Sequence, residues 1–368
     1  MMKRIVAASA CMLMLATSAP VYSSKLRPEG TVIEQKLAER EAGYWERRTI
    51  KAALAAIQLV GEPVHEEITN RILGCEGDSA ICGDPQIEPD NAYVLAGVRW
   101  NDDPPFRLGA EYAKLPGCVP DSTIRLVTFP LCWASVFKDG SKRAAAGTEL
   151  TGRNAALLTR SHFGDLQFLH AMAWKDGASA REVQGQILAW AEFTWKLALQ
   201  EIKLDTLVRE VPVEGVAQIF SENGWSVQDL FALGNPHVRR PSQVSRLAFG
   251  SLLHVVQDSF ARGHVERESM VSYVKCGNTQ YRRPGRIIEF HSYINQDSKK
   301  HGHEDTAYAF NTSLSHAPNV IEVGQALAEL YERKAPWDEA KPYLECIFEL
   351  APEVRDSGPG SAFQKKAL

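Results

Sequence analysis

The stretch Leu-Ala-Phe-Gly-Ser-Leu-Leu-His-Val-Val-Gln-Asp-Ser-Phe-Ala-Arg-Gly-His-Val, residues 247 to 265, is the most informative part of the sequence. Its apolar residues have the spacing of a buried helix. His254 and Asp258 are four residues apart, so both side chains leave one face of such a helix, one turn apart. Gly263 can end the helix in the left-handed conformation and return His264 toward them. Two imidazoles and a carboxylate are ligands that zinc prefers, and a carboxylate can bridge two ions.

A structural role is the alternative interpretation of this stretch. Buried polar side chains usually have a hydrogen-bond partner within the protein or in ordered water. His254 and Asp258 would then form a hydrogen-bonded pair inside the helix, and His264 would lie on the surface. The rest of the sequence has to distinguish a metal site from this pair.

The composition is that of a soluble globular protein. The chain has 368 residues, of which 45% are hydrophobic and 23% charged, and a net charge of −4. No overall basic charge indicates binding to nucleic acid. Because no linker rich in proline, glycine or serine divides the chain, we expect one domain over residues 24 to 356.

Residues 1 to 23 are predicted to be a signal peptide. Lys3 and Arg4 precede an apolar run from Ile5 to Ala16 that is too short to span a membrane. The small residues Val21 and Ser23 favour cleavage near Ser23. We therefore expect a secreted or periplasmic protein with no transmembrane segment in the mature chain.

The cysteines outside this segment are even in number, which in an exported chain favours disulfides over metal thiolates. Six cysteines allow fifteen pairings, so the connectivity stays open. The local or nearest remaining pairs are Cys75 with Cys82, Cys118 with Cys132, and Cys276 with Cys346. The first two of these pairs would close short loops and are the better supported.

The periodicity predicts an all-α fold, a multi-helix bundle with the candidate ligands clustered between helices. Strand signals are almost absent. Residues 106 to 150 are predicted to be rich in loops, and residues 357 to 368 to form a flexible tail. The expected helices cover residues 31 to 60, 64 to 73, 91 to 100, 166 to 175, 179 to 202, 205 to 221, 226 to 232, the central stretch after Pro241-Ser242, 317 to 334 and 337 to 350.

Other imidazoles and carboxylates extend the central triplet. His301 and Asp305 repeat its four-residue spacing. A lone histidine near a helix start, such as His65, is commonly a partly exposed polar residue, and the two carboxylates after Trp100 could equally cap the next segment. The full candidate set is His65, Asp102, His162, His254, Asp258, His264, His301 and Asp305.

These motifs resemble the superfamily of bacterial zinc-dependent phospholipases C and fungal single-strand-specific nucleases. The central stretch has a histidine, then an aspartate after three intervening residues, then a second histidine after five more. This spacing matches the most specific signature of that superfamily. Ser161-His162-Phe163-x-Asp165 is similar to its phospholipase form, which favours His162 over His170 as a ligand. The motifs run in the order of the superfamily from residue 65 to residue 306, and this order favours the metal site over the structural pair.

Three further segments share the resemblance. The helix from His65 to Arg71 is similar to the helix that carries the first histidine of the superfamily. Trp100-Asn101-Asp102 resembles its short aspartate motif and favours Asp102 over Asp103. His301-x-x-x-Asp305-Thr306 resembles the final histidine and acid.

The resemblance implies a secreted α-helical enzyme with a trinuclear zinc cluster. One zinc would be held by Asp102, His162, His254 and Asp258, and a second by His264, His301 and Asp305. His65 would help to hold a third, with Asp258 bridging. The hydrolysis of a phosphodiester by metal-activated hydroxide would follow, with Asp102 as the candidate catalytic carboxylate that orients or deprotonates the water.

The sequence departs from the superfamily in three places. No tryptophan follows the predicted cleavage site, where the superfamily uses one for its third zinc, so we expect two to three ions; Trp45 could serve only after removal of a propeptide. Arg262-Gly263 replaces the usual proline before His264. Phe290-His291-Ser292 resembles the phospholipase version of the last histidine motif but lacks an acid four residues later, so His291 remains the alternate to His301.

Phospholipase C activity on phospholipid headgroups is the first functional hypothesis, because the segment around His162 and an acidic, secreted chain suit a zwitterionic headgroup. Peripheral contact with a membrane surface would accompany it. A nuclease for single-stranded nucleic acid is the second, with stacking aromatics among Trp100, Phe163 and Tyr293. The third is an interaction protein with a degenerate, non-catalytic metal site.

Overall fold

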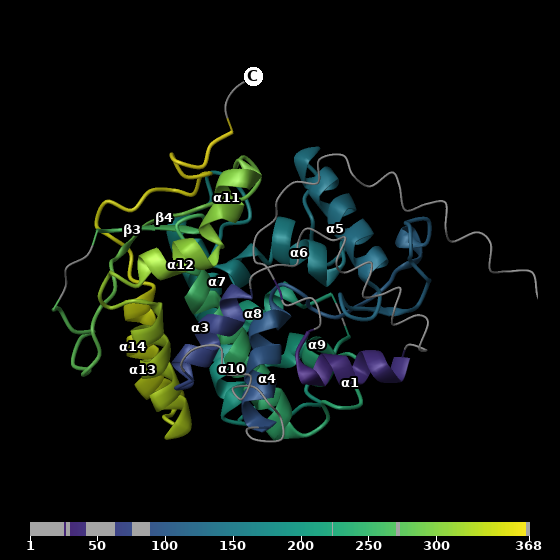
Figure 1. Cartoon of the computed structure of the whole chain (residues 1–368), viewed down its shortest axis with the longest axis horizontal. Helices are drawn as coiled ribbons and strands as arrows, with labels where there is room; N and C mark the ends of the chain where they lie inside the picture. Colours follow the sequence, from purple (N-terminus) through teal and green to yellow (C-terminus); the bar gives the residue numbers. More distant parts are fainter. Residues whose placement is uncertain are drawn as a thin grey trace, which may run out of the picture.

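The computed structural model describes residue 26 and residues 30 to 41, 63 to 75, 89 to 222, 224 to 269 and 273 to 365 (Figure 1). Over these residues the structure is mainly helical, as the sequence predicts, and its strands form two small antiparallel sheets. The predicted signal peptide lies outside them. No helix in the described part of the chain is long and apolar enough to cross a bilayer.

The elements follow one another along the chain with short connections. The α-helices are α1 (Val32–Glu41), α3 (Val64–Ile72), α4 (Pro89–Trp100), α5 (Pro130–Ala145), α6 (Leu157–Phe163), α7 (Ala180–Ala198), α8 (Glu214–Ile219), α9 (Val227–Ala232), α10 (Pro241–Asp258), α11 (Ser298–Glu304), α12 (Ala307–Ser313), α13 (Val320–Glu332) and α14 (Trp337–Ile347). The 3-10 turns are η1 (Ala110–Tyr112), η2 (Gln167–His170) and η3 (Val208–Glu210). The strands are β1 (Phe106–Arg107), β2 (Thr123–Ile124), β3 (Val265–Arg267) and β4 (Ile287–Phe290), paired β1 with β2 and β3 with β4.

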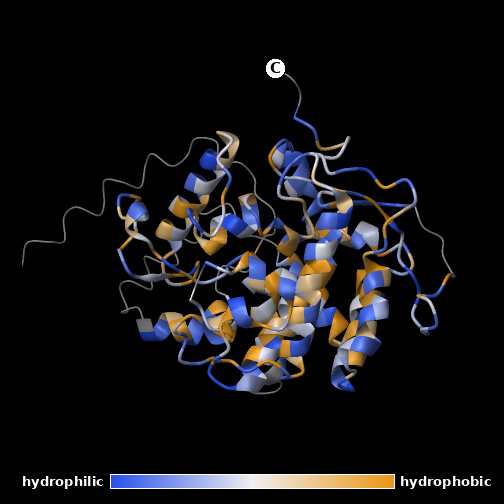
Figure 2. Cartoon of the chain, turned by 180° about the vertical axis from the view of Figure 1, so that it is seen from behind, coloured by the Kyte–Doolittle hydropathy of each residue, from blue (hydrophilic) through white to orange (hydrophobic). Residues whose placement is uncertain are grey.

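Helix α10 is the central helix of the bundle and packs against α4, α7, α3 and α13. It begins at Pro241, whose missing N–H costs nothing at the first helical position. From Leu247 onward nearly every side chain is buried. Figure 2 shows hydrophobic and hydrophilic residues interspersed along the surrounding helices, and apolar side chains of α4, α7 and α13 belong to the buried core.

Two glycines let α4 and α10 cross with their backbones in contact. A Cβ atom on Gly97 would overlap the carbonyl oxygen of Leu247, and one on Gly250 would overlap the carbonyl oxygen of Val94. Only glycine fits at either position, because backbone cannot move aside as a flexible side chain can. The crossing brings Asp102, just after α4, close to the C-terminal half of α10.

Several predicted helices are confirmed, and others differ. The helix expected over residues 31 to 60 exists as α1, and residues 42 to 60 lie outside the described part. The segment expected to be rich in loops contains α5, whose interior Gly140 obscures the periodicity. A Cβ on Gly140 would lie 2.8 Å from Cβ of Thr159, so the glycine permits close packing on α6.

The region around residues 157 to 171 also differs from its prediction. The helix expected over residues 166 to 175 is instead the 3-10 turn η2, which ends at His170 and is followed by Ala171 with a φ of 51°. His162 lies on the helix before it, α6. The Asp165 carboxylate between the two elements accepts hydrogen bonds from Arg160 at 2.8 Å.

The C-terminal segment is packed against the domain rather than flexible over residues 357 to 365. The N–H of Ser292 donates to the carbonyl oxygen of Gly358 at 2.7 Å, and that of Asp297 to the carbonyl oxygen of Phe363 at 2.7 Å. The Phe363 side chain is buried. These backbone contacts join segments far apart in the sequence, so local composition does not indicate them.

Two of the cysteine pairings are confirmed. Cys118 is bonded to Cys132, and Cys276 to Cys346. The third predicted pair includes Cys82, which lies outside the described residues.

Candidate metal centre

The eight ligands predicted from the sequence converge in the interior, and His170 joins them. The resulting cluster contains six imidazoles and three carboxylates, in three groups that share members and a fourth that adjoins them where His264 lies 3.5 Å from Asp258. Helices α3, α6, α10 and α11 and the turn η2 contribute the imidazoles, together with His264 before β3. Except for His162, whose side chain is 8% exposed, every member is buried. These groups could hold metal ions.

Asp258 lies at the centre of the cluster. Its Oδ2 is 2.9 Å from Nε2 of His254 and 2.9 Å from Nδ1 of His170. Its Oδ1 is 3.2 Å from Nε2 of His65. One carboxylate therefore contacts imidazoles from three different segments of the chain.

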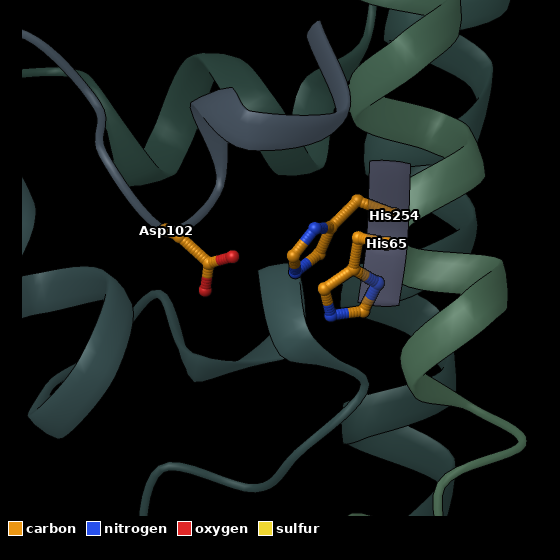
Figure 3. Close-up of side chains that lie close together, drawn as sticks. All are labelled: His65, Asp102 and His254. Carbon is orange, nitrogen blue, oxygen red and sulfur yellow. The ribbon is translucent and has the colours of Figure 1, made fainter. Parts of the chain in front are cut away.

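Asp102 faces the same centre from the end of α4. Figure 3 shows its carboxylate directed toward the rings of His65 and His254, and one donor atom of each of the three lies within 4.8 Å of the others. Its Oδ1 is 3.8 Å from Nε2 of His162 and 3.8 Å from Nδ1 of His170. Neither carboxylate oxygen has a hydrogen-bond partner among the described residues. A buried carboxylate without such partners is costly unless a cation or a proton compensates it.

His264, His301 and Asp305 form a neighbouring group. Asp305 places Oδ1 3.4 Å from Nε2 of His264 and Oδ2 3.4 Å from Nε2 of His301. The two imidazole rings are stacked with centroids 4.9 Å apart. Gly263 does not take the left-handed conformation expected of it. Because Gly263 has no side chain, it leaves room for the ring of His301: a Cβ at Gly263 would lie 3.0 Å from Nδ1 of His301.

Hydrogen bonds to backbone orient two of the imidazoles. The Nδ1 of His264 is 2.7 Å from the carbonyl oxygen of His170, and the Nδ1 of His162 is 2.9 Å from that of Leu158. A carbonyl oxygen can only accept, so Nδ1 carries a proton, and in the neutral imidazole the lone pair is then on Nε2. In both residues that Nε2 is the nitrogen nearest a cluster carboxylate, the arrangement typical of a metal-binding histidine.

His65 is oriented by side chains instead. Its Nδ1 is 2.8 Å from Oε1 of Gln257, whose Nε2 donates to Oγ1 of Thr69 at 2.8 Å. The bond to Thr69 fixes the amide so that its oxygen faces the ring. The Nε2 of His65 is thus left for Asp258 and the cluster.

Asn101 ties the aspartate turn to two other ligand segments. Its Nδ2 donates to the carbonyl oxygen of Leu169 at 2.6 Å, and its Oδ1 accepts from Oγ of Ser251 at 2.6 Å. The indole N–H of Trp190 donates to the same hydroxyl at 3.1 Å. The sequence did not predict these hydrogen bonds of Asn101, although Asn101 is part of the Trp100-Asn101-Asp102 motif.

Proton affinities within the cluster are strongly shifted. Burial, together with the carboxylates of Asp258 and other acids, raises the pKa of Asp102 well above its ordinary value despite the opposing effect of His65. Burial would also raise the pKa of Asp258, but the imidazoles of His264, His254 and His65 outweigh it and lower that pKa. Burial lowers the pKa of His254 to about 3. A neutral imidazole is the form that binds metal.

The spacing of the donor atoms suits small tetrahedral ions. Zinc ligands at about 2.0–2.1 Å in a tetrahedron lie about 3.4 Å from one another. The contacts of Asp258, Asp102 and Asp305 with imidazoles range from 2.9 to 3.8 Å and bracket that value. The donor set of imidazole nitrogens and carboxylate oxygens fits zinc as well.

The alternates to the predicted ligands have different environments. Asp103 accepts hydrogen bonds from the N–H of Leu126 at 3.1 Å and the indole of Trp133 at 2.7 Å, so it has a structural role. His291 is grouped with two glutamates rather than with Asp305. His170, in contrast, is as close to Asp102 as His162 is, and it alone of the two also contacts Asp258.

A cavity of about 740 Å³ opens onto the cluster at His65, Asp258 and Asp305. Its wall, as far as the described residues define it, includes the aromatic side chains of Phe260, Tyr308, Phe310 and Phe363. Trp100, named from the sequence as a possible stacking residue, is buried against Trp190 in the core. Phe163 and Tyr293 lie on the other side of the cluster, in a narrow pocket beside His162 and His301.

No known protein family, curated protein or solved structure matches this chain. The site is therefore interpreted from its own residues and geometry.

Proposed function

We propose that this protein is an exported zinc-dependent phosphodiester hydrolase of the phospholipase C type, related to the superfamily that its motifs resemble. One observation carries the proposal: six imidazoles and three carboxylates form a continuous buried cluster at the end of an open cavity. The two disulfides are compatible with export.

The residues present fit two to three zinc ions. Asp102, His254 and Asp258 would hold one ion together with His162 or His170. His264, His301 and Asp305 would hold a second, and His65 with Asp258 would contribute to a third. The unpartnered oxygens of Asp102 support this assignment, because a bound cation would compensate their burial.

The chemistry assigned to the chain follows from these positions. Bound zinc would lower the pKa of a water molecule and bind the non-bridging oxygens of a phosphodiester. Asp102 would orient that water or accept its proton as well as bind an ion, because its carboxylate is directed toward His65 and His254 and has no hydrogen-bond partner among the described residues. Asn101 holds the Asp102 turn in place through Leu169 and Ser251.

A phospholipid is the proposed substrate. The aromatic residues on the cavity wall would contact the glycerol and acyl part, and the cluster would receive the phosphodiester. Tyr308 is 72% exposed at this cavity, and an exposed tyrosine suits peripheral contact with a lipid surface. The same exposed tyrosine favours the alternative, a nuclease that stacks single-stranded bases on it.

The test offers phosphatidylcholine vesicles and single-stranded DNA side by side to the zinc-loaded full chain. We expect release of the phosphorylated headgroup, its loss on treatment with a chelator, and its recovery with added zinc. The Asp258→Asn variant is the matched control for activity that does not come from the cluster. Cleavage of DNA alone would favour the nuclease. A zinc-loaded protein that hydrolyses neither substrate would identify a non-catalytic metal-binding protein.

A further inference from the structure

A separate group of potential ligands lies on the β3–β4 hairpin. Glu266 on β3 is directly opposite Glu289 on β4, and His291 follows two residues later, so alternation places all three on one face. One donor atom of each lies within 4.8 Å of the others. Like charges directly opposite one another on paired strands repel, so this face requires a compensating cation.

Arg355 compensates the two glutamates only in part. It donates to Oε2 of Glu289 from Nε at 3.0 Å and from Nη2 at 2.8 Å, and Nη2 also donates to Oε2 of Glu266 at 2.5 Å. One guanidinium carries one positive charge against two carboxylates. The Arg355 side chain is 52% exposed and can turn into solvent at little cost.

His291 has a nitrogen that these contacts leave without a partner. The residue is 2% exposed, and its Nδ1 lies 3.0 Å from the carbonyl oxygen of Gly263. Nδ1 therefore carries the proton, and the lone pair is on Nε2, which has no hydrogen-bond partner among the described residues. Gly360, with a φ of +74°, lets the C-terminal segment pass close to this ring without a Cβ clash.

We propose that Glu266, Glu289 and His291 form an additional zinc site, outside the central cluster and competing with Arg355. Two carboxylates and an imidazole are suitable ligands for zinc. Glu266 and His291 line the same cavity that opens onto the cluster, so an ion has a path to them. The proposal does not depend on the hydrolytic activity.

Zinc stoichiometry tests this site. The full chain and the Glu289→Gln variant are dialysed against zinc, and bound metal is counted by elemental analysis. We expect one zinc fewer in Glu289→Gln than in the parent. Glu268→Gln is the matched control, because that glutamate lies beside the hairpin but pairs with Arg286 at 2.7 Å. This difference of one zinc ion between the parent and Glu289→Gln does not depend on how many ions the central cluster holds.

Arg355→Gln separates a zinc site from a simple ion-pair network. Removal of the competing positive charge should lower the dissociation constant of this zinc ion, the one that Glu289→Gln loses, roughly tenfold. His291→Gln, which keeps both glutamates and Arg355, should lose the same ion. Equal stoichiometry in the parent and in both variants would overturn the proposal, as would binding only at millimolar zinc, which would indicate an adventitious ion only.

Discussion

Asp258 contacts imidazoles from α3, η2 and α10 because both of its oxygens face the interior. We predict that Asp258→Asn lowers activity by at least about a hundredfold and loses zinc, because the amide keeps the shape but not the charge that several imidazoles share. His65→Ala should have a smaller effect, since His65 would contribute only to the third ion. Steady-state rates and metal content would measure both. Parental activity in Asp258→Asn would contradict the assignment.

His301 and Asp305 are expected to hold an ion with His264. We predict that His301→Ala and Asp305→Ala each lose at least one zinc and most of the activity, because each removes one of the three ligand residues that this group has within the described part of the chain. His303→Ala is the control on the same helix, since its side chain is 62% exposed and belongs to no group of buried ligands. Elemental analysis distinguishes the variants. Unchanged zinc in His301→Ala would remove this group from the centre.

Helices α4 and α10 meet at Gly97 and Gly250, and this contact sets where Asp102 lies relative to Asp258. We predict that Gly250→Ala destabilises the fold by about 1–3 kcal/mol, because the added methyl group forces two backbones apart. Urea unfolding measures the loss. Metal affinity should fall with it, since the two aspartates would separate.

The matched control for that crossing is Gly185→Ala on α7. Nothing lies within 4 Å of a Cβ at this position. Alanine should therefore stabilise the helix by up to about 1 kcal/mol. A similar gain of stability in both variants would mean that the crossing tolerates a methyl group and that helix propensity alone is being measured.

The fold of the whole molecule buries carboxylates whose negative charge a bound metal would compensate. We predict that removing zinc with a strong chelator lowers the free energy of unfolding by about 4 kcal/mol or more, the stabilisation expected of a ligand present at a thousand times its dissociation constant. Chemical unfolding with and without chelator measures it. Asp258→Asn should show a smaller difference, and an equal difference would place the stabilising ion elsewhere.

The spacing of residues along the sequence was sufficient to predict features that depend on one helix or one short loop. The apolar run of α10 with His254 and Asp258 one turn apart, the His301 and Asp305 pair and the Cys118–Cys132 loop all depend on residues close in sequence. The backbone of a helix determines which side chains share a face, so these features could be predicted without the fold.

Only the tertiary structure decided the contacts between distant segments. It placed His170 beside Asp258, fastened the Asp102 turn through Asn101 and packed residues 357 to 365 onto the segment around His291. None of these has a periodic signal, because each requires two stretches of backbone to pack at a particular distance. The glycine crossing at Gly97 and Gly250 supplies one such distance, and it is steric contact between helices, rather than the spacing along either one, that brings the candidate ligands together.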